Sequence, residues 1–261
     1  MKRFLLLLAA LLFAHNAWAQ EPTVDEIVTR ANNRSYYQGK DGRAKALMIV
    51  TDAQNRTRQR QLTILKVNVQ EGGDQKYFVY FHKPNDVRGM SYIVWKRVGK
   101  DDDRWLYLPA LDLVRRIAAS DKRSSFAGTT FLHEDISGRS IDLDNHELIS
   151  SDQAHYILKN TPKDSGVVEF SYYTVAIDKN NFVPMRAEYF DKSGKLYRTI
   201  ETLVVEDIQG YPTVTRMKAT DLNSNSNTVT EFSNVSYDLG LADDIFTERF
   251  LRTPPQQWLK E

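Results

Sequence analysis

Two adjacent arginines and a later acidic pair are the residues in this chain best suited to form a specific ionic contact. Arg115 and Arg116 lie on an expected strand, and Glu134 and Asp135 follow further along the chain. Successive residues of a strand point to opposite faces, so one arginine should face solvent and the other should meet Asp135 or a neighbouring carboxylate. Such a pair could latch the segment 119–135 in place or clamp a phosphate group. The alternative is an ion pair with a purely structural role.

The other polar residues show no arrangement typical of an enzyme or a metal site. His133 precedes Glu134 and Asp135, but the histidines beyond residue 19 show neither an i, i+4 pair nor a Cys/His spacing. Cysteine is absent, and no G-x-S-x-G motif is present. The pair Gly72-Gly73 indicates a turn and not a phosphate-binding loop. We therefore expect no catalytic residues, no metal ion and no cofactor.

Large apolar side chains are concentrated on a few short strands. Tyr77–Phe81 and Trp105–Leu108 are apolar on both faces, and Ser91–Trp95 is nearly so. Such strands need cover on both sides, by a core on one side and by a helix, loop, partner or ligand on the other. The expected wall of a hydrophobic cavity consists of Phe78, Tyr80, Ile93, Trp95, Trp105, Tyr107, Phe126 and Phe131. Apolar walls suit hydrocarbon because binding scales with buried apolar area, although each of these residues could equally belong to an ordinary core.

The segment 119–135 has no clear periodicity and is long for a connection inside a compact domain. Ser124, Ser125 and Gly128 give it conformational freedom, which favours a movable lid. The alternative is a long but rigid loop whose aromatic side chains, Phe126 and Phe131, are fixed in the core.

The elements that must position these residues are mainly strands. Turn-forming residues recur between β-branched and aromatic runs, which predicts an antiparallel meander of about ten or eleven strands. A capping box and apolar residues at helical spacing predict one amphipathic helix over residues 23–33. Residues 137–152 should form a polar break, and residues 243–251 a short helix or turn that stops before Pro254-Pro255. A strongly curved sheet wrapped around helices satisfies this pattern.

The first nineteen residues are typical of a cleaved signal peptide. Lys2-Arg3 precedes the apolar stretch Phe4–Ala14, which is too short to span a bilayer comfortably, and Ala17–Ala19 is a small-x-small cleavage site. The alternative is a short membrane anchor. The remainder, 20–261, is close to neutral and has no long apolar run, so we expect one soluble domain that does not bind nucleic acid. Without cysteine, this domain must be stabilised by its core.

A series of motifs runs through the same region. Phe81–Gly89 fits the pattern F-x-x-P-x-D-V-R-G, and Trp105–Leu111 reads W-L-Y-L-P-A-L. The motifs V-R-R-I, S-D-K, S-F-x-G and E-D follow in order up to Asp135, and residues 182–196 fit a later hairpin. This series resembles the outer-membrane lipoprotein-sorting protein family related to LolA, over nearly the whole chain after residue 19.

The resemblance implies a mainly β fold, an incomplete antiparallel β-barrel whose concave side is covered by a few short helices and a loop. It also implies a hydrophobic cavity for acyl chains and residence in the periplasm. In many members it implies work alongside an inner-membrane exporter of the resistance-nodulation-division type. The resulting hypothesis is a non-enzymatic carrier or chaperone for a lipid or lipoprotein. The alternative is a periplasmic adaptor of an envelope exporter with no ligand in the cavity.

Overall fold

The structure, a computed structural model, describes residues 21–70 and 72–259. The predicted signal peptide, residues 1–19, lies outside the described residues. The strands of the first half are β1 (Asp41–Thr51), β2 (Thr57–Asn68), β3 (Gln75–Lys83), β4 (Ser91–Lys96), β5 (Asp103–Leu108) and β6 (Leu113–Ile117). Those of the second half are β7 (Asp144–Ser151), β8 (His155–Pro162), β9 (Phe170–Asp178), β10 (Pro184–Asp191), β11 (Leu196–Ile208), β12 (Tyr211–Asp221) and β13 (Ser226–Tyr237).

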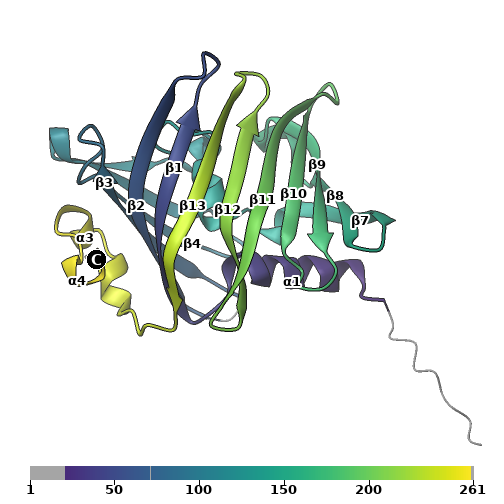
Figure 1. Ribbon diagram of the computed structural model, residues 1–261, viewed down its shortest axis with the longest axis horizontal. Coiled ribbons are helices and arrows are strands. Elements are labelled where there is room, and N and C mark those ends of the chain that lie inside the picture. The colour runs from purple at the N-terminus through teal and green to yellow at the C-terminus, as the bar shows by residue number, and fades with distance from the viewer. Residues whose placement is uncertain (1–20, 71, 260–261) are drawn as a thin grey trace, which may run out of the picture.

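All of these strands belong to one antiparallel sheet. Its order is β6-β5-β4-β3-β2-β1-β13-β12-β11-β10-β9-β8-β7, so two meanders meet where β1 pairs with β13. The ends β6 and β7 do not pair with each other, and the sheet curves round without closing (Figure 1). The prediction of a mainly β, incomplete barrel is confirmed, with thirteen strands among the described residues instead of ten or eleven.

The underestimate has a clear source in β7. This strand lies inside the stretch 137–152 that was expected to be a polar break, and its sequence D-N-H-E-L-I-S-S has no apolar run. As an edge strand that is mostly exposed, β7 buries little apolar surface. The polar pattern therefore reflects its position at the edge and not the lack of a strand.

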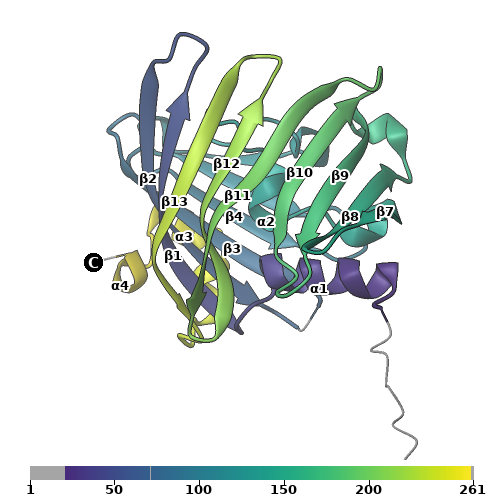
Figure 2. The same ribbon diagram turned by 45° about the vertical axis from the view of Figure 1, so that its right-hand side comes forward.

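Short helices cover the concave side. Helix α1 (Val24–Tyr36) begins at Thr23 with the predicted capping box and buries Ile27, Val28 and Ala31 against strands β8 and β9. It crosses the lower opening of the half-barrel (Figures 1 and 2). Helix α2 (His133–Ser137) ends the segment 119–135 and lies between the two walls of the sheet (Figure 2).

The convex side has its own cover at the C-terminal end of the chain. After β13 come a 3-10 turn (Asp243–Phe246), α3 (Arg249–Arg252) and α4 (Gln256–Leu259). Figure 1 shows α3 and α4 outside the curved sheet; α3 contacts β4 and β5, and the 3-10 turn contacts β3. The short helical segment expected over residues 243–251 ends before Pro254-Pro255, as predicted, and α4 is a new helical turn after the two prolines.

Alternation along the central strands separates two cores. On β3, Tyr77, Val79 and Phe81 belong to the concave core, whereas Phe78 and Tyr80 belong to the convex core beneath the C-terminal segment. This explains why these strands are apolar on both faces, because each face is covered by a different part of the chain.

Candidate functional site

A cavity of about 440 Å³ lies on the concave side of the sheet. Its size falls within the range of small-molecule sites in proteins, roughly 300–1,000 Å³. Strands β1, β2 and β8 to β13 form most of its wall, and α1 and the segment 119–137 close it. Its apolar lining includes Ala31, Met48, Leu62, Ile64, Leu158, Val175, Ile177, Ala187, Ile200, Met217 and Phe232.

Most of this lining comes from the second half of the chain, which sequence reasoning did not select. One signal was present, since Val183, Met185, Ala187 and Tyr189 alternate with more polar residues. Three of these four, Val183, Ala187 and Tyr189, line the cavity. A register shift between Pro184 and Arg186 separates Met185 from this series. The alternation therefore coincides with part of the cavity wall, although from the sequence it predicted only a sheet with one face exposed to solvent.

Two of the eight predicted wall residues line the cavity. Phe126 and Phe131 lie at its boundary and are almost fully buried. The structure places the other six in the convex core, under the C-terminal segment: Phe78, Tyr80, Ile93, Trp95, Trp105 and Tyr107. Their expected position on the cavity wall is thus corrected, whereas ligand binding by Phe126 and Phe131 stays a prediction.

The convex core is closed by specific contacts. Phe246 is fully buried in it, and its carbonyl oxygen accepts a hydrogen bond of 2.6 Å from Trp95 Nε1. The Asp41 carboxylate accepts bonds of 2.7–2.9 Å from the backbone N–H groups of Leu239, Gly240 and Leu241. These contacts hold the start of the C-terminal segment against β1. The aromatic side chains on the convex face of the sheet are therefore covered by protein and not by a ligand.

The segment 119–135 is fastened to the sheet. Phe126 N donates to Phe131 O at 2.8 Å, which closes the segment on itself. Near its tip, Thr130 N donates to Thr228 Oγ1 at 3.0 Å, and Thr130 Oγ1 donates to Ala219 O at 2.9 Å. In this conformation the segment fits the description of a loop held by Phe126 and Phe131, and its movement as a lid stays a prediction.

The two predicted latch arginines make other contacts. Arg115 and Arg116 lie on the edge strand β6, and both are exposed. Arg116 pairs with Asp103 and lies over the ring of Trp105 on the convex side. Arg115, opposite Leu106, lies on the other face, so the expected alternation is confirmed. The expected contact of either arginine with Asp135 is wrong, because Asp135 pairs with Arg198 of β11.

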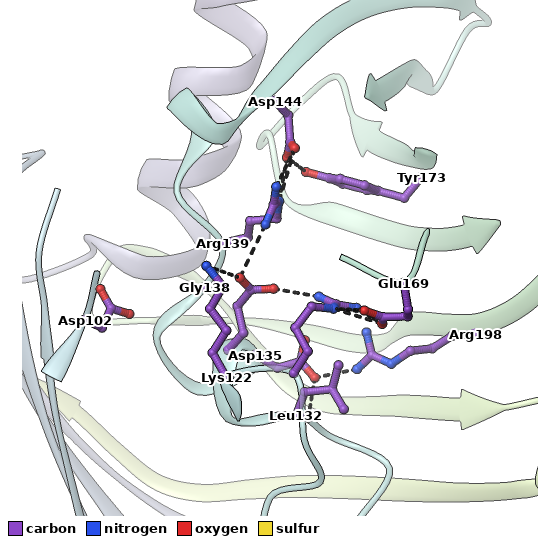
Figure 3. A network of polar contacts seen from close by, with 12 residues as sticks. Asp102, Lys122, Leu132, Asp135, Gly138, Arg139, Asp144, Glu169, Tyr173 and Arg198 are labelled. Atoms are coloured by element: carbon purple, nitrogen blue, oxygen red, sulfur yellow. Dashed lines mark hydrogen bonds and ion pairs between the residues drawn. The ribbon is translucent and has the colours of Figure 1, made fainter. Parts of the chain in front are cut away.

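A largely buried set of charges lies beside the cavity, and sequence reasoning missed it as a set. We call it the charged wall; it consists of Arg123, Glu134, Asp135, Arg139, Asp144, Glu169 and Arg198. Three of its members, Glu134, Asp135 and Arg139, line the cavity, whereas Glu169 is exposed. Figure 3 shows Arg139 directed at Asp144, which Tyr173 also reaches, and Arg198 directed at Asp135. Glu169 and Arg198 are far in the sequence from the other five residues, so no local spacing could have indicated the whole set.

Glu134 is the centre of the charged wall. Its carboxylate lies 2.6 Å from Arg123 Nη1, 3.5 Å from Arg139 Nη1 and 3.8 Å from Lys122 Nζ. Arg123 also makes hydrogen bonds of 2.7–2.9 Å to Glu169. Burial alone would lower the pKa of Arg123, but its hydrogen bonds to Glu169 and the charge of Glu134 raise it overall, so the guanidinium stays charged. Buried charges persist when they are paired in this way.

Two lysines on the concave side have no carboxylate partner among residues 21–70 and 72–259. Lys66 Nζ, at the cavity, donates 2.8 Å hydrogen bonds to the carbonyl oxygens of Tyr36 and Gln38. Lys96 Nζ donates to Ser137 O at 2.6 Å and Gly138 O at 3.2 Å. Burial lowers the pKa of each lysine to about 8. Gly138 has φ +77°, and a Cβ there would lie 2.4 Å from the Tyr36 ring, so glycine is required where α2 ends beside α1.

Among residues 21–70 and 72–259, no group of three His, Cys, Asp or Glu side chains could hold a metal ion. Within the same residues, no helix has the length and apolar character needed to cross a membrane. His133, next to Glu134, is buried between Tyr92 and Phe126, and burial lowers its pKa to about 4. A neutral imidazole in aromatic surroundings is typical of a packed core.

Comparison with known proteins decides the family. A family model described as an uncharacterized protein matches residues 73–253. The crystal structure of a DUF1329 family protein from Desulfovibrio piger is 30% identical, with a TM-score of 0.79 over 87% of this chain and 98% of that one. The chain belongs to the DUF1329 family. No curated protein matches its sequence.

Two further solved structures are similar to this DUF1329 protein. One is described as an outer membrane lipoprotein-sorting protein domain from Vibrio parahaemolyticus; it is 26% identical, with a TM-score of 0.78 over 87% of this chain and 97% of that one. The other is a LolA superfamily protein from Nitrosomonas europaea, 20% identical, with a TM-score of 0.69 over 88% and 99%. The second shares the fold. The resemblance found in the sequence motifs is thereby confirmed.

Proposed function

We propose that this DUF1329 protein is a carrier or chaperone that binds acyl chains of a lipid or lipoprotein in the concave cavity. The observation that carries this proposal is a cavity of about 440 Å³ walled mainly by apolar side chains inside a half-barrel of LolA type. Each buried CH₂ of an acyl chain contributes about 0.8 kcal/mol, so one chain of ordinary length binds firmly in such a space.

The mechanism is binding and release without covalent chemistry. The curved sheet is the fixed part, and α1 together with the segment 119–135 is the cover. An acyl chain enters or leaves when this cover shifts. The motif series typical of the family lies largely in the cover and the strands before it, which is consistent with a function that depends on both.

We place this activity in the periplasm, on the basis of the sequence pattern of residues 1–19 and the family resemblance. The carrier then needs a membrane partner that supplies or receives the cargo. An inner-membrane exporter of the resistance-nodulation-division type is our proposed partner, as the resemblance implies. An adaptor that binds such an exporter with an empty cavity is the competing description.

Organic-solvent extraction of the purified full chain, followed by mass spectrometry, tests the proposal. We expect lipid to be recovered in a fixed ratio to protein. A clean extract, combined with failure of delipidated protein to take up fluorescent fatty acid, would contradict a carrier and favour the adaptor.

A pair of variants on one strand tests the location. Ile200 lines the cavity on β11, whereas Leu203 on the same strand is exposed. We expect Ile200→Asp to lower fatty-acid affinity by about tenfold or more, because it places a charge where hydrocarbon is bound. Leu203→Asp is the matched control and should bind as the unchanged protein does. Equal affinities for both variants would show that the ligand lies elsewhere.

A further inference from the structure

A second hollow, which we call the polar pocket, lies beside the apolar cavity and has a volume of about 250 Å³. It is bordered by the turn between β4 and β5 and by the residues that follow α2. Its lining consists of Gly99, Lys100, Asp101, Asp102, Arg104, Lys122, Glu134, Gly138, Ser140, Asp142 and Leu143. The lining is thus rich in charges of both signs, in contrast with the apolar cavity.

The cations of this pocket have free donors in its inner part. Arg104 is almost fully buried, and its Nη2 donates to Asp102 Oδ2 at 2.5 Å, but its Nε has no hydrogen-bond partner among the described residues. Lys122 is largely buried, and its only ion pair in the described part of the chain is the 3.8 Å contact with Glu134, too long for a hydrogen bond. A buried donor without a partner, such as Arg104 Nε, is costly, and the positive charge of Lys122 lines the same pocket, which favours an oxyanion between Arg104 and Lys122.

The rim of the polar pocket has the opposite character. Asp101, Asp142 and Lys100 line it and are exposed, so the rim carries two carboxylates and one ammonium group. Neither carboxylate makes an ion pair or a side-chain hydrogen bond within residues 21–70 and 72–259. The two free carboxylates outnumber the one lysine, so the rim has a net negative charge that favours a cationic group.

Glu134 connects the two hollows, because it lines both the apolar cavity and the polar pocket. Lys122 holds it by the longest of its three ionic contacts, so an anion can take over Lys122 while Arg123 and Arg139 still neutralise Glu134. Figure 3 shows Lys122 at the side of the charged wall that faces Asp102. From the inside outwards, a ligand would therefore meet first the apolar cavity, then the cations Arg104 and Lys122, and last the exposed carboxylates Asp101 and Asp142.

That order matches one type of amphiphile, and we propose that the polar pocket binds a phosphate-ammonium zwitterion of the phosphoethanolamine type. Its phosphate contacts Lys122 and Arg104, and its ammonium contacts Asp101 and Asp142. In a lipid of this type the phosphate lies next to the acylated part and the ammonium lies furthest out, the same sequence as in the protein. The proposal rests on the carrier function above, since the acyl chain then occupies the apolar cavity.

The test compares three single-chain lipids with the same acyl chain: lysophosphatidylethanolamine, lysophosphatidylglycerol and monoacylglycerol. Each is titrated into delipidated full-length protein below its micelle concentration and followed by calorimetry. We expect the ethanolamine lipid to bind about tenfold more tightly than either of the others. The glycerol lipid has no ammonium group to pair with Asp101 and Asp142, and monoacylglycerol also has no phosphate to pair with Lys122 and Arg104.

Variants locate the effect. Lys122→Met should reduce the preference over monoacylglycerol, and Asp142→Asn should reduce the preference over the glycerol lipid. Both positions reach solvent, so both variants should fold, and Lys83→Met, an exposed lysine at the end of β3, is the matched control. Loss of the preference in Lys83→Met as well would overturn the assignment to this pocket.

The outcomes separate this proposal from the carrier function. If none of the three lipids binds, the carrier function itself is contradicted. If all three bind equally and the variants change nothing, the carrier function stands and the headgroup site is overturned. If free phosphoethanolamine binds as tightly as the lyso-lipid and Lys122→Met abolishes it, the chemistry of the pocket is supported but its assignment to a lipid headgroup is overturned.

Discussion

Glu134 is the residue on which most of the buried charge depends. Its carboxylate faces Arg123, Arg139 and Lys122, and Arg123 also lies 4.8 Å over the ring of Phe170. Removing Glu134 would leave Arg123, Arg139 and Lys122 with two carboxylates in place of three, because Arg123 keeps Glu169 and Arg139 keeps Asp144. The balance of the charged wall therefore matters more than any single contact in it.

We expect Glu134→Ala to lower the free energy of unfolding by about 3–5 kcal/mol, the usual cost of breaking a buried ion pair. Urea denaturation followed by circular dichroism measures it. Glu231→Ala is the control, since Glu231 pairs with Arg216 at 3.3 Å on an exposed part of the sheet, and it should cost less than about 1 kcal/mol. Similar losses for the two variants would contradict the importance given to the charged wall.

Lys96 gives the protein a dependence on alkaline pH with a definite sign. Burial lowers its pKa to about 8 in the folded chain, from an ordinary value of 10.5. Above pH 8 the unfolded chain therefore holds a proton that the folded chain has released, so stability rises as pH increases. Lys66 acts in the same direction, because burial lowers its pKa to about 8 as well.

We expect the free energy of unfolding to rise between pH 8 and pH 9.5, and Lys96→Met to show a smaller rise. The window ends there because buried Tyr77 and Tyr173 have pKa values well above 10, so the ionisation of these tyrosines in the unfolded chain lowers stability at higher pH. Urea midpoints at several pH values measure both slopes. Identical slopes for the two proteins would show that Lys96 keeps its proton.

At the scale of elements, the segment 119–135 is the part whose motion matters most for ligand exchange. The chain contains no cysteine, so a pair introduced at Thr130 and Thr228 forms the only possible disulfide. Thr130 N lies 3.0 Å from Thr228 Oγ1, so the two positions are close enough for a cross-link to be attempted. The cross-link would tie the tip of the segment to β13.

If the segment is a lid, Thr130→Cys/Thr228→Cys should release fatty acid at least about tenfold more slowly when oxidised than when reduced, because the cross-link prevents opening. Stopped-flow transfer of a fluorescent fatty acid to vesicles measures the rate, and the reduced form of the same variant is the control. Equal rates in both redox states would mean that the ligand leaves by another route, with α1 the remaining cover.

The strands and α1 were largely predictable because their patterns are local. The capping box at Thr23 and the apolar spacing gave α1, and the alternation of turns and aromatic runs gave most strands. Edge strand β7 was missed since it buries little and so lacks an apolar run. The charged wall was missed because Arg123, Glu169 and Arg198 meet only after the second meander has folded over the first.

The assignment of the aromatic residues shows a similar limit for the candidate site. Two-faced strands correctly indicated cover on both sides, but the pattern does not say which cover is protein and which is ligand. The C-terminal segment, with Phe246 and Leu251 fully buried, covers Trp105 and its neighbours. Only Phe126 and Phe131, carried by the segment 119–135, remained at the cavity.

At the scale of the whole molecule, the fold combines a continuous sheet with an interior that its own side chains do not fill. Hydrocarbon that enters the cavity of about 440 Å³ would add packing contacts to its apolar lining, which only the folded chain forms. The two edges β6 and β7 do not pair, so the sheet can hold this space without the constraint of a closed barrel. Ligand binding and stability should therefore be linked.

We expect the free energy of unfolding of delipidated protein to rise with fatty-acid concentration, by about 2.7 kcal/mol at one hundred times the dissociation constant, because only the folded chain forms the cavity. Urea unfolding at increasing ligand concentration measures it. The Leu203→Asp variant should show the same rise and Ile200→Asp almost none, since only Ile200 lines the cavity. A rise of equal size in both variants would mean that fatty acid stabilises the protein by binding to its outer surface. The apolar cavity would then not be the fatty-acid site.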